Sequence, residues 1–154
     1  MKPDFFDKFI ERKMTLGSVE SVTGGLFGSS ITKYAHASKF YCGGLIVYNN
    51  LAKQQLAHVK KESLDKYKAI SREVVLELAN NVLKQLGTDV VIGFVGNAGP
   101  SSQDDQPVGS CYMAIVSKDD AIVYHDQLSG DRQHIQQQLN QLADIRLNMW
   151  LEEH

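Results

Sequence analysis

Three residues between positions 38 and 53 carry side chains that could together form an activated serine nucleophile. The hydroxyl of Ser38 would be a useful nucleophile only if a base removed its proton. Lys53 could be that base if burial or nearby positive charge lowered its pKa toward neutrality, and Tyr48 could relay the proton or orient the amine. Tyr48 is expected to end a strand and Lys53 to lie in the first turn of the next helix, so both could point into one cleft. Taken alone, they are more typical of a sheet-edge aromatic and a surface lysine.

The segment Glu20-Ser21-Val22-Thr23-Gly24-Gly25 is a second candidate. Two glycines let the backbone approach a ligand, and the predicted helix that follows offers free N–H groups and a partial positive charge, which suit a phosphate. The alternative is a tight turn with an ordinary helix cap. No Gly-Lys-Ser/Thr follows, so this is not a Walker loop.

Two further segments could help to bind an anion. Gly96-Asn97-Ala98-Gly99-Pro100 follows the most apolar predicted strand, and its N–H groups could line an oxyanion or phosphate site. Gly130-Asp131-Arg132 opens the last predicted helix, where a guanidinium beside free N–H groups favours a phosphate. An ordinary turn and an aspartate helix cap explain the two segments equally well.

The sequence predicts neither a metal site nor a disulfide framework. The five histidines include no i, i+4 pair and no His-Glu-x-x-His, and there are only two cysteines, Cys42 and Cys111. Two cysteines are typical of a protein in a reducing compartment, so we expect a cytoplasmic location. No cofactor is expected either.

Composition excludes several function classes. The 154 residues carry a formal charge of −2, which is unlike a nucleic-acid-binding surface. No apolar run approaches the roughly 18 residues of a membrane span, and the first thirteen residues do not resemble a signal peptide. The basic stretch at residues 60–68 is interleaved with acids and indicates a solvated helix face.

Hydrophobic periodicity predicts the elements that must position these groups. Helices are expected at residues 3–13, 26–34, 51–58 and 72–86 and from Asp131 onward, and strands at residues 16–21, 40–48, 89–95, 110–117 and 121–128. Helices and strands alternate in the first half and a hairpin closes the second. The pattern favours a single α/β domain over residues 1–154, a three-layer α/β/α sandwich with a mixed sheet.

Six motifs in order resemble the CinA C-terminal domain family, which includes stand-alone nicotinamide-nucleotide amidohydrolases. They cover nearly the whole chain: Glu20-Ser21-x-Thr23-Gly24-Gly25, Ser38-x-Phe40-x-x-Gly43-Gly44-x-x-x-Tyr48-x-x-x-x-Lys53, Ile70-Ser71, Gly96-x-Ala98-Gly99-Pro100, Pro107-Val108-Gly109 and Gly130-Asp131-Arg132.

The resemblance implies deamidation of nicotinamide mononucleotide to nicotinate mononucleotide and ammonia, without a metal, in a homodimer. It assigns the nucleophile to Ser38, assisted by Tyr48 and Lys53. The pyridine nucleotide would be bound by a second set of residues: Glu20, Ser21, Thr23, Gly24, Gly25, Asn97, Ala98, Gly99 and Arg132.

The chain departs from the family pattern at several positions. Val95 stands where Ser or Thr is common, and residues 101–106 form a shorter, more acidic loop. These changes leave open a second possibility, a weakly active or silent paralogue that binds a nucleotide as a regulatory module. A third is an interaction module that uses Met149 and Trp150 on the last helix, although that face is more typical of core packing.

Overall fold

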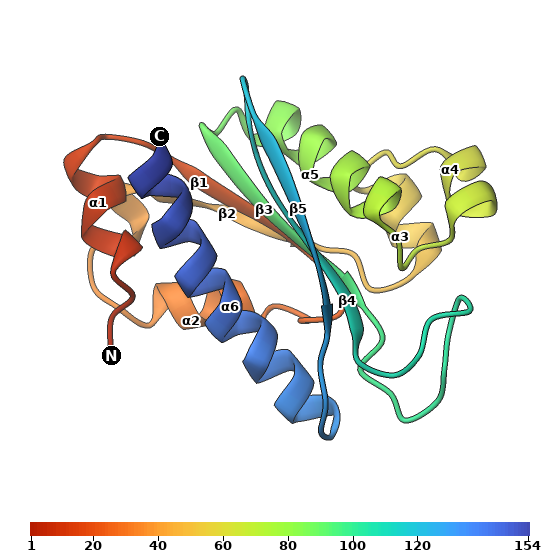
Figure 1. The fold of residues 1–154 in the computed structure, drawn as a ribbon. Helices are drawn as coiled ribbons and strands as arrows, with labels where there is room; N and C mark the ends of the chain where they lie inside the picture. The colour runs from red at the N-terminus through yellow and green to blue at the C-terminus, as the bar shows by residue number, and fades with distance from the viewer.

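The computed structural model describes residues 1–154 and contains one five-stranded mixed sheet (Figure 1). The strand order is β2 (Tyr41–Ile46), β1 (Leu16–Glu20), β3 (Val90–Gly96), β4 (Ser110–Ser117), β5 (Ala121–Gln127). The first three strands are parallel, whereas β4 and β5 run antiparallel to their neighbours and form the predicted hairpin.

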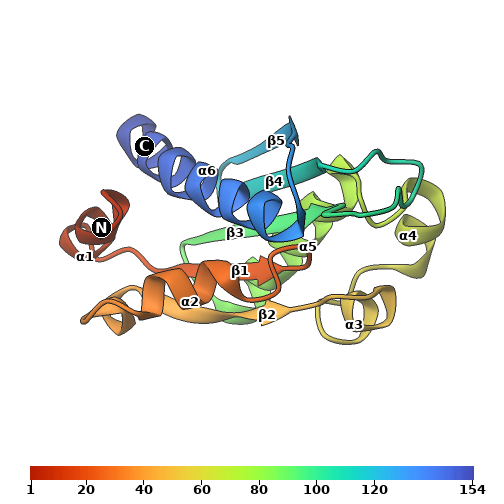
Figure 2. The ribbon, with the colours of Figure 1, turned by 90° about the horizontal axis from the view of Figure 1, so that it is seen from below.

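Helices cover both faces of the sheet (Figures 1 and 2). One face carries α1 (Phe5–Glu11), α2 (Leu26–Thr32) and α6 (Arg132–Glu153), and the other carries α3 (Asn50–Gln55), α4 (Lys61–Tyr67) and α5 (Arg72–Leu86). The three-layer α/β/α arrangement predicted from the sequence is therefore confirmed. None of these helices combines the length and the apolar character needed to cross a membrane.

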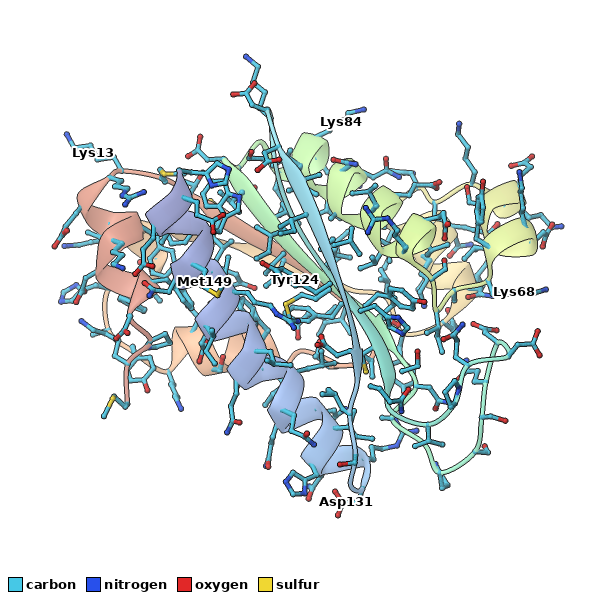
Figure 3. All side chains as sticks on the ribbon, viewed as in Figure 1. Lys13, Lys68, Lys84, Tyr124, Asp131 and Met149 are labelled. Atoms are coloured by element: carbon cyan, nitrogen blue, oxygen red, sulfur yellow. The ribbon has the colours of Figure 1, made fainter.

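Strand β3 is apolar throughout because it contributes to two cores. Ile92 and Phe94 pack with the helices on one face, while Val91 and Val95 pack against α5 on the other. A central strand with both faces covered has no solvent-facing positions that would favour polar residues. Trp150 of α6 lies in the first core, whereas Met149 is exposed (Figure 3), so the last helix mainly packs on its own domain.

Side-chain caps fix where the site-bearing helices begin. Ser71 accepts a hydrogen bond from the backbone N–H of Val74 and so starts α5, which ends at the left-handed Gly87 and covers the predicted range 72–86. Asn49 caps α3 through the N–H of Ala52 at 2.8 Å, and Asp131 caps α6. These caps satisfy amides that the first turn of each helix would leave unpaired.

The parallel strands β1, β2 and β3 end at the same edge of the sheet. Their following loops therefore meet there, joined by the start of α6 and by the connection between α4 and α5. The opposite edge carries a short 3-10 helix, η1 (Ala37–Lys39), which precedes β2. Ligands of open α/β sheets bind beyond the carboxyl ends of the strands. A site is therefore expected at the edge where β1, β2 and β3 end, opposite η1.

Candidate active site

A cavity of about 410 Å³ opens at the carboxyl ends of the parallel strands. Its wall combines segments that are far apart in the sequence, and mixes polar with apolar groups: Ser21, Val22, Tyr48, Asn49, Asn50, Lys53, Ala69, Ile70, Val95, Gly96, Asn97, Ala98, Gln103, Asp104 and Arg132. The volume is in the range typical of small-molecule sites.

The most reactive arrangement in this cavity is the pair formed by Lys53 and Ser21. The Nζ atom of Lys53 donates a hydrogen bond to Ser21 Oγ at 3.0 Å. Lys53 is only 2% exposed and Ser21 8% exposed. A buried lysine with a serine hydroxyl as its only hydrogen-bond partner is costly for folding, which marks the pair as a functional candidate.

Burial lowers the pKa of Lys53 from 10.5 to about 8, because desolvation disfavours the ammonium form, while the carboxylate of Asp104 acts in the opposite direction. A substantial fraction of the amine is then neutral slightly above neutral pH. A neutral amine 3.0 Å from a hydroxyl oxygen is within the reach of a general base. The arrangement can therefore activate a serine nucleophile.

The backbone holds Ser21 rigidly at the end of β1. Its N–H donates to the carbonyl of Phe94 in β3, and its own carbonyl accepts from Gly24 N. Lys53 reaches it from the first turns of α3, the helix that Asn49 caps. A fixed strand end and a capped helix thus set the distance between the two side chains.

The N-terminus of α2 does not offer the expected phosphate site, because the carboxylate of Glu20 occupies it. Glu20 accepts hydrogen bonds from the N–H groups of Gly25, Phe27 and Gly28 at 3.2, 2.9 and 3.1 Å, and from the hydroxyl of Thr23 at 2.7 Å. This carboxylate already satisfies the amides that a phosphate would require.

The structure therefore corrects the expected roles of four residues. Glu20 and Thr23 are buried and stabilise the turn, and neither they nor Gly24 and Gly25 line the cavity. Of the residues in the 20–25 loop that were predicted to contact substrate, only Ser21 lies in the cavity wall.

The expectation that Ser38 shares a cleft with Tyr48 and Lys53 is wrong. Ser38 is exposed in η1, before the start of β2, whereas Tyr48 follows the end of that strand. Six residues of strand separate the two edges by roughly 20 Å at about 3.3 Å per residue. Within this chain, Ser21 takes the place beside Lys53 that the sequence assigned to Ser38.

Arg132 and Tyr48 form the rim of the cavity. The guanidinium of Arg132 donates to Tyr48 Oη at 2.9 Å and to the carbonyl of Gly99. Gly99 itself lies outside the wall, whereas Asn97 and Ala98 are part of it. The side chain of Asn97 also braces its loop, donating to the carbonyl of Ser101 at 3.0 Å and accepting from Gly99 N at 2.9 Å.

Sequence reasoning did not single out Asp104, which lines the cavity from the loop between β3 and β4. Gln103 and Gln106 pair through their backbones, and Asp104 and Asp105 between them have φ values of 54° and 60°. Left-handed backbone at both central residues is the signature of a type I′ turn. Two consecutive aspartates in a short loop were the available signal, since aspartate tolerates this conformation better than most residues.

Comparison with known proteins decides the family. The model of the CinA C-terminal domain matches residues 1–149. The chain belongs to the CinA C-terminal domain family. A Bacillus mycoides relative named as a competence-damage inducible protein is 40% identical over 144 residues, which are 93% of this chain and 35% of that protein. The Mycoplasma pneumoniae relative named Protein MG115 homolog is 35% identical over 85% of this chain and 84% of its own length.

Solved structures of the CinA superfamily share the fold. One from Klebsiella pneumoniae superposes with a TM-score of 0.93 at 26% identity, covering 96% of this chain and 93% of that one. One from Agrobacterium tumefaciens, titled as a competence/damage inducible protein, gives 0.88 at 25% identity over 94% of this chain and 91% of its own. This CinA-family chain spans 35% of the length of the Bacillus mycoides relative and 29% of the length of a Bacillus subtilis relative.

Proposed function

We propose that this CinA-family chain is an amidohydrolase that releases ammonia from the carboxamide of a pyridine mononucleotide, with Ser21 as nucleophile and Lys53 as base. The observation that carries the proposal is the 3.0 Å hydrogen bond from Lys53 Nζ to Ser21 Oγ inside a cavity of about 410 Å³. A serine–lysine pair of this kind supports acyl transfer without a histidine.

The reaction begins when neutral Lys53 takes the hydroxyl proton of Ser21 and the oxygen attacks the carboxamide carbon. The tetrahedral intermediate collapses as its C–N bond breaks, and the ammonium of Lys53 returns the proton to the leaving ammonia. Water then attacks the ester on Ser21, and Lys53 transfers the water proton to the departing serine oxygen. The products are ammonia and the nucleotide carboxylic acid, which ionises, so atoms and charge balance.

Backbone amides in the cavity wall can stabilise the oxyanion. The N–H groups of Val22 and Ala98 have no hydrogen-bond acceptor within the chain, and both residues line the cavity. Donors fixed in advance stabilise developing negative charge more effectively than water, which must reorient. Arg132 at the rim supplies the positive charge for the phosphate. The start of α2 cannot bind the phosphate, because Glu20 already occupies its N–H groups.

The direct test is ammonia release from nicotinamide mononucleotide by the purified protein, measured with a coupled assay and checked by chromatography of nicotinate mononucleotide. We expect both products in equal amounts, and Lys53→Met to reduce their formation to the rate without enzyme. Absence of both products with the wild-type protein would overturn the proposal.

Val95 favours a second candidate, a nucleotide-binding regulatory protein with little turnover. The buried side chain of Val95 lines the cavity, at a position where family members commonly carry a hydroxyl. A thermal-shift titration with nicotinamide mononucleotide distinguishes the two functions. Stabilisation by about 2.7 kcal/mol at 100 times Kd, without ammonia release, would identify the regulatory protein.

A further inference from the structure

Three charged side chains line the cavity, and they enter it from different sides. Lys53 lies deep in the wall, Arg132 stands at the exposed rim, and Asp104 reaches in from the type I′ turn. Lys53 and Asp104 line the same cavity, and the carboxylate of Asp104 partly offsets the lowering of the pKa of Lys53 by burial. Arg132 instead contacts Tyr48 Oη and the carbonyl of Gly99 at the rim.

We propose that Asp104 determines substrate specificity by binding a positive charge on the ring that carries the carboxamide. This inference rests on the proposed function and names the residue that distinguishes its N-substituted pyridinium carboxamide from uncharged aromatic carboxamides of the same shape. The cationic ring lies toward Asp104, and the phosphate lies toward Arg132.

The contacts of Asp104 leave its negative charge unpaired. The carboxylate accepts one hydrogen bond, from Ile70 N to Oδ2 at 3.3 Å, and it belongs to none of the ion pairs of the chain. The side chain is half-buried, so water satisfies it only in part. A partly desolvated carboxylate without a partner gains most from a cation that enters the cavity.

The need for that cation follows from the chemistry at Lys53. Lys53 must be neutral when it accepts the serine proton, so at that moment it cannot balance Asp104. A pyridinium ring bound beside the carboxylate supplies the missing positive charge. The same positive charge disfavours the ammonium form of Lys53, so the cationic substrate also helps to keep the base neutral.

The fold offers a matched control one residue away. Asp105 has the same charge and sits in the same turn with a φ of 60°, but it is exposed and does not line the cavity. Asparagine tolerates left-handed backbone, so Asp104→Asn and Asp105→Asn both preserve the turn. Only the first removes a charge from the cavity.

The test compares nicotinamide mononucleotide with the C-nucleoside monophosphate in which a neutral benzamide ring replaces the pyridinium. Dissociation constants from calorimetry and kcat/KM from ammonia release are measured at about pH 9, where the amine of Lys53, with its pKa of about 8, is mostly neutral. We expect the wild-type protein and Asp105→Asn to prefer the cation by about tenfold, the effect of one partly solvated charge pair. Asp104→Asn should lose that preference through weaker binding of the cation.

The two measurements separate this inference from the proposed function. An Asp104-dependent preference in binding without hydrolysis of either compound would support the inference and overturn the reaction. Hydrolysis with a preference that Asp104→Asn changes by less than twofold would support the reaction and overturn the inference. Failure of both compounds to bind would overturn both.

Discussion

Lys53 Nζ lies 3.0 Å from Ser21 Oγ, and both side chains are buried. One residue comes from the end of β1 and the other from α3, 32 positions later. Their contact exists because β1 and β2 are parallel neighbours, so the segments that follow them lie at the same edge of the sheet. The chemistry proposed for this chain depends on that contact.

Substitution of the two candidate serines distinguishes the nucleophile. We expect Ser21→Ala to lower kcat for ammonia release by at least about a thousandfold, because loss of a nucleophile removes the covalent route. Ser38→Ala should leave kcat and KM unchanged, because Ser38 is exposed at the opposite edge of the sheet. Steady-state kinetics on the two variants check this; the reverse pattern would remove Ser21 from the mechanism.

The pH dependence of the reaction should report Lys53. Its pKa is lowered to about 8, chiefly by burial, and only the neutral amine can accept the serine proton. We therefore expect kcat/KM to rise with pH and to level off above about pH 8. This rise would report the loss of one proton from Lys53 in the free enzyme. A profile that is flat between pH 6 and 9 would contradict this role for Lys53.

Removal of Lys53 should stabilise the fold while it abolishes activity. The pKa falls from 10.5 to about 8 on folding, so between these values the unfolded chain binds more protons and stability rises with pH. Below pH 8 the folded protein carries the full cost of burying the ammonium. We expect Lys53→Met to raise the free energy of unfolding there by about 1–3 kcal/mol, and the gain to disappear above about pH 10.5. Urea titrations at pH 7 and 10.5 measure both values.

Glu20 should behave as a structural residue. Its carboxylate accepts four hydrogen bonds around the start of α2, so Glu20→Ala leaves buried amides unpaired. We expect a loss of about 2–4 kcal/mol in the free energy of unfolding. Glu20→Gln, which keeps an acceptor oxygen, should lose less. If Glu20→Ala unfolded like the wild-type protein but bound nucleotide poorly, Glu20 would instead be a substrate ligand.

The sequence predicts the fold well because its signals are local. The helix predicted at residues 72–86 is confirmed as α5, and the most apolar predicted strand, at residues 89–95, is confirmed as β3. Each of these features depends on residues that are neighbours along the chain. The family assignment is confirmed as well, because it rests on ordered motifs across the whole chain.

The composition of the site was harder to predict, because it depends on which end of the sheet each loop lies at and on where each side chain points. Ser38 and Tyr48 flank one strand, so they lie at opposite edges of the sheet. The order of motifs along the chain contains no information about this separation. The orientation of Glu20 depends on how α2 packs. The position of Asp104 depends on left-handed backbone at two consecutive aspartates. Such features appear only when the tertiary structure is known.

Arg132 supplies the last prediction. Its guanidinium is exposed at the rim and is held by Tyr48 Oη and the carbonyl of Gly99, so it is positioned without being neutralised by a carboxylate. We expect Arg132→Met to raise KM for nicotinamide mononucleotide by about 10–100-fold, the loss of one charge-assisted phosphate contact, with kcat little changed because the reacting atoms lie near Ser21.

The riboside that lacks the phosphate provides the control for this change. Its kcat/KM should be the same for the wild-type protein and Arg132→Met, because no anion remains for the guanidinium to bind. Tyr48→Phe removes the hydroxyl that supports Arg132 but leaves the charge, so it should raise KM for the nucleotide by less than Arg132→Met does. Equal losses on nucleotide and riboside would instead show that Arg132 shapes the cavity, because only a phosphate contact depends on the presence of the phosphate.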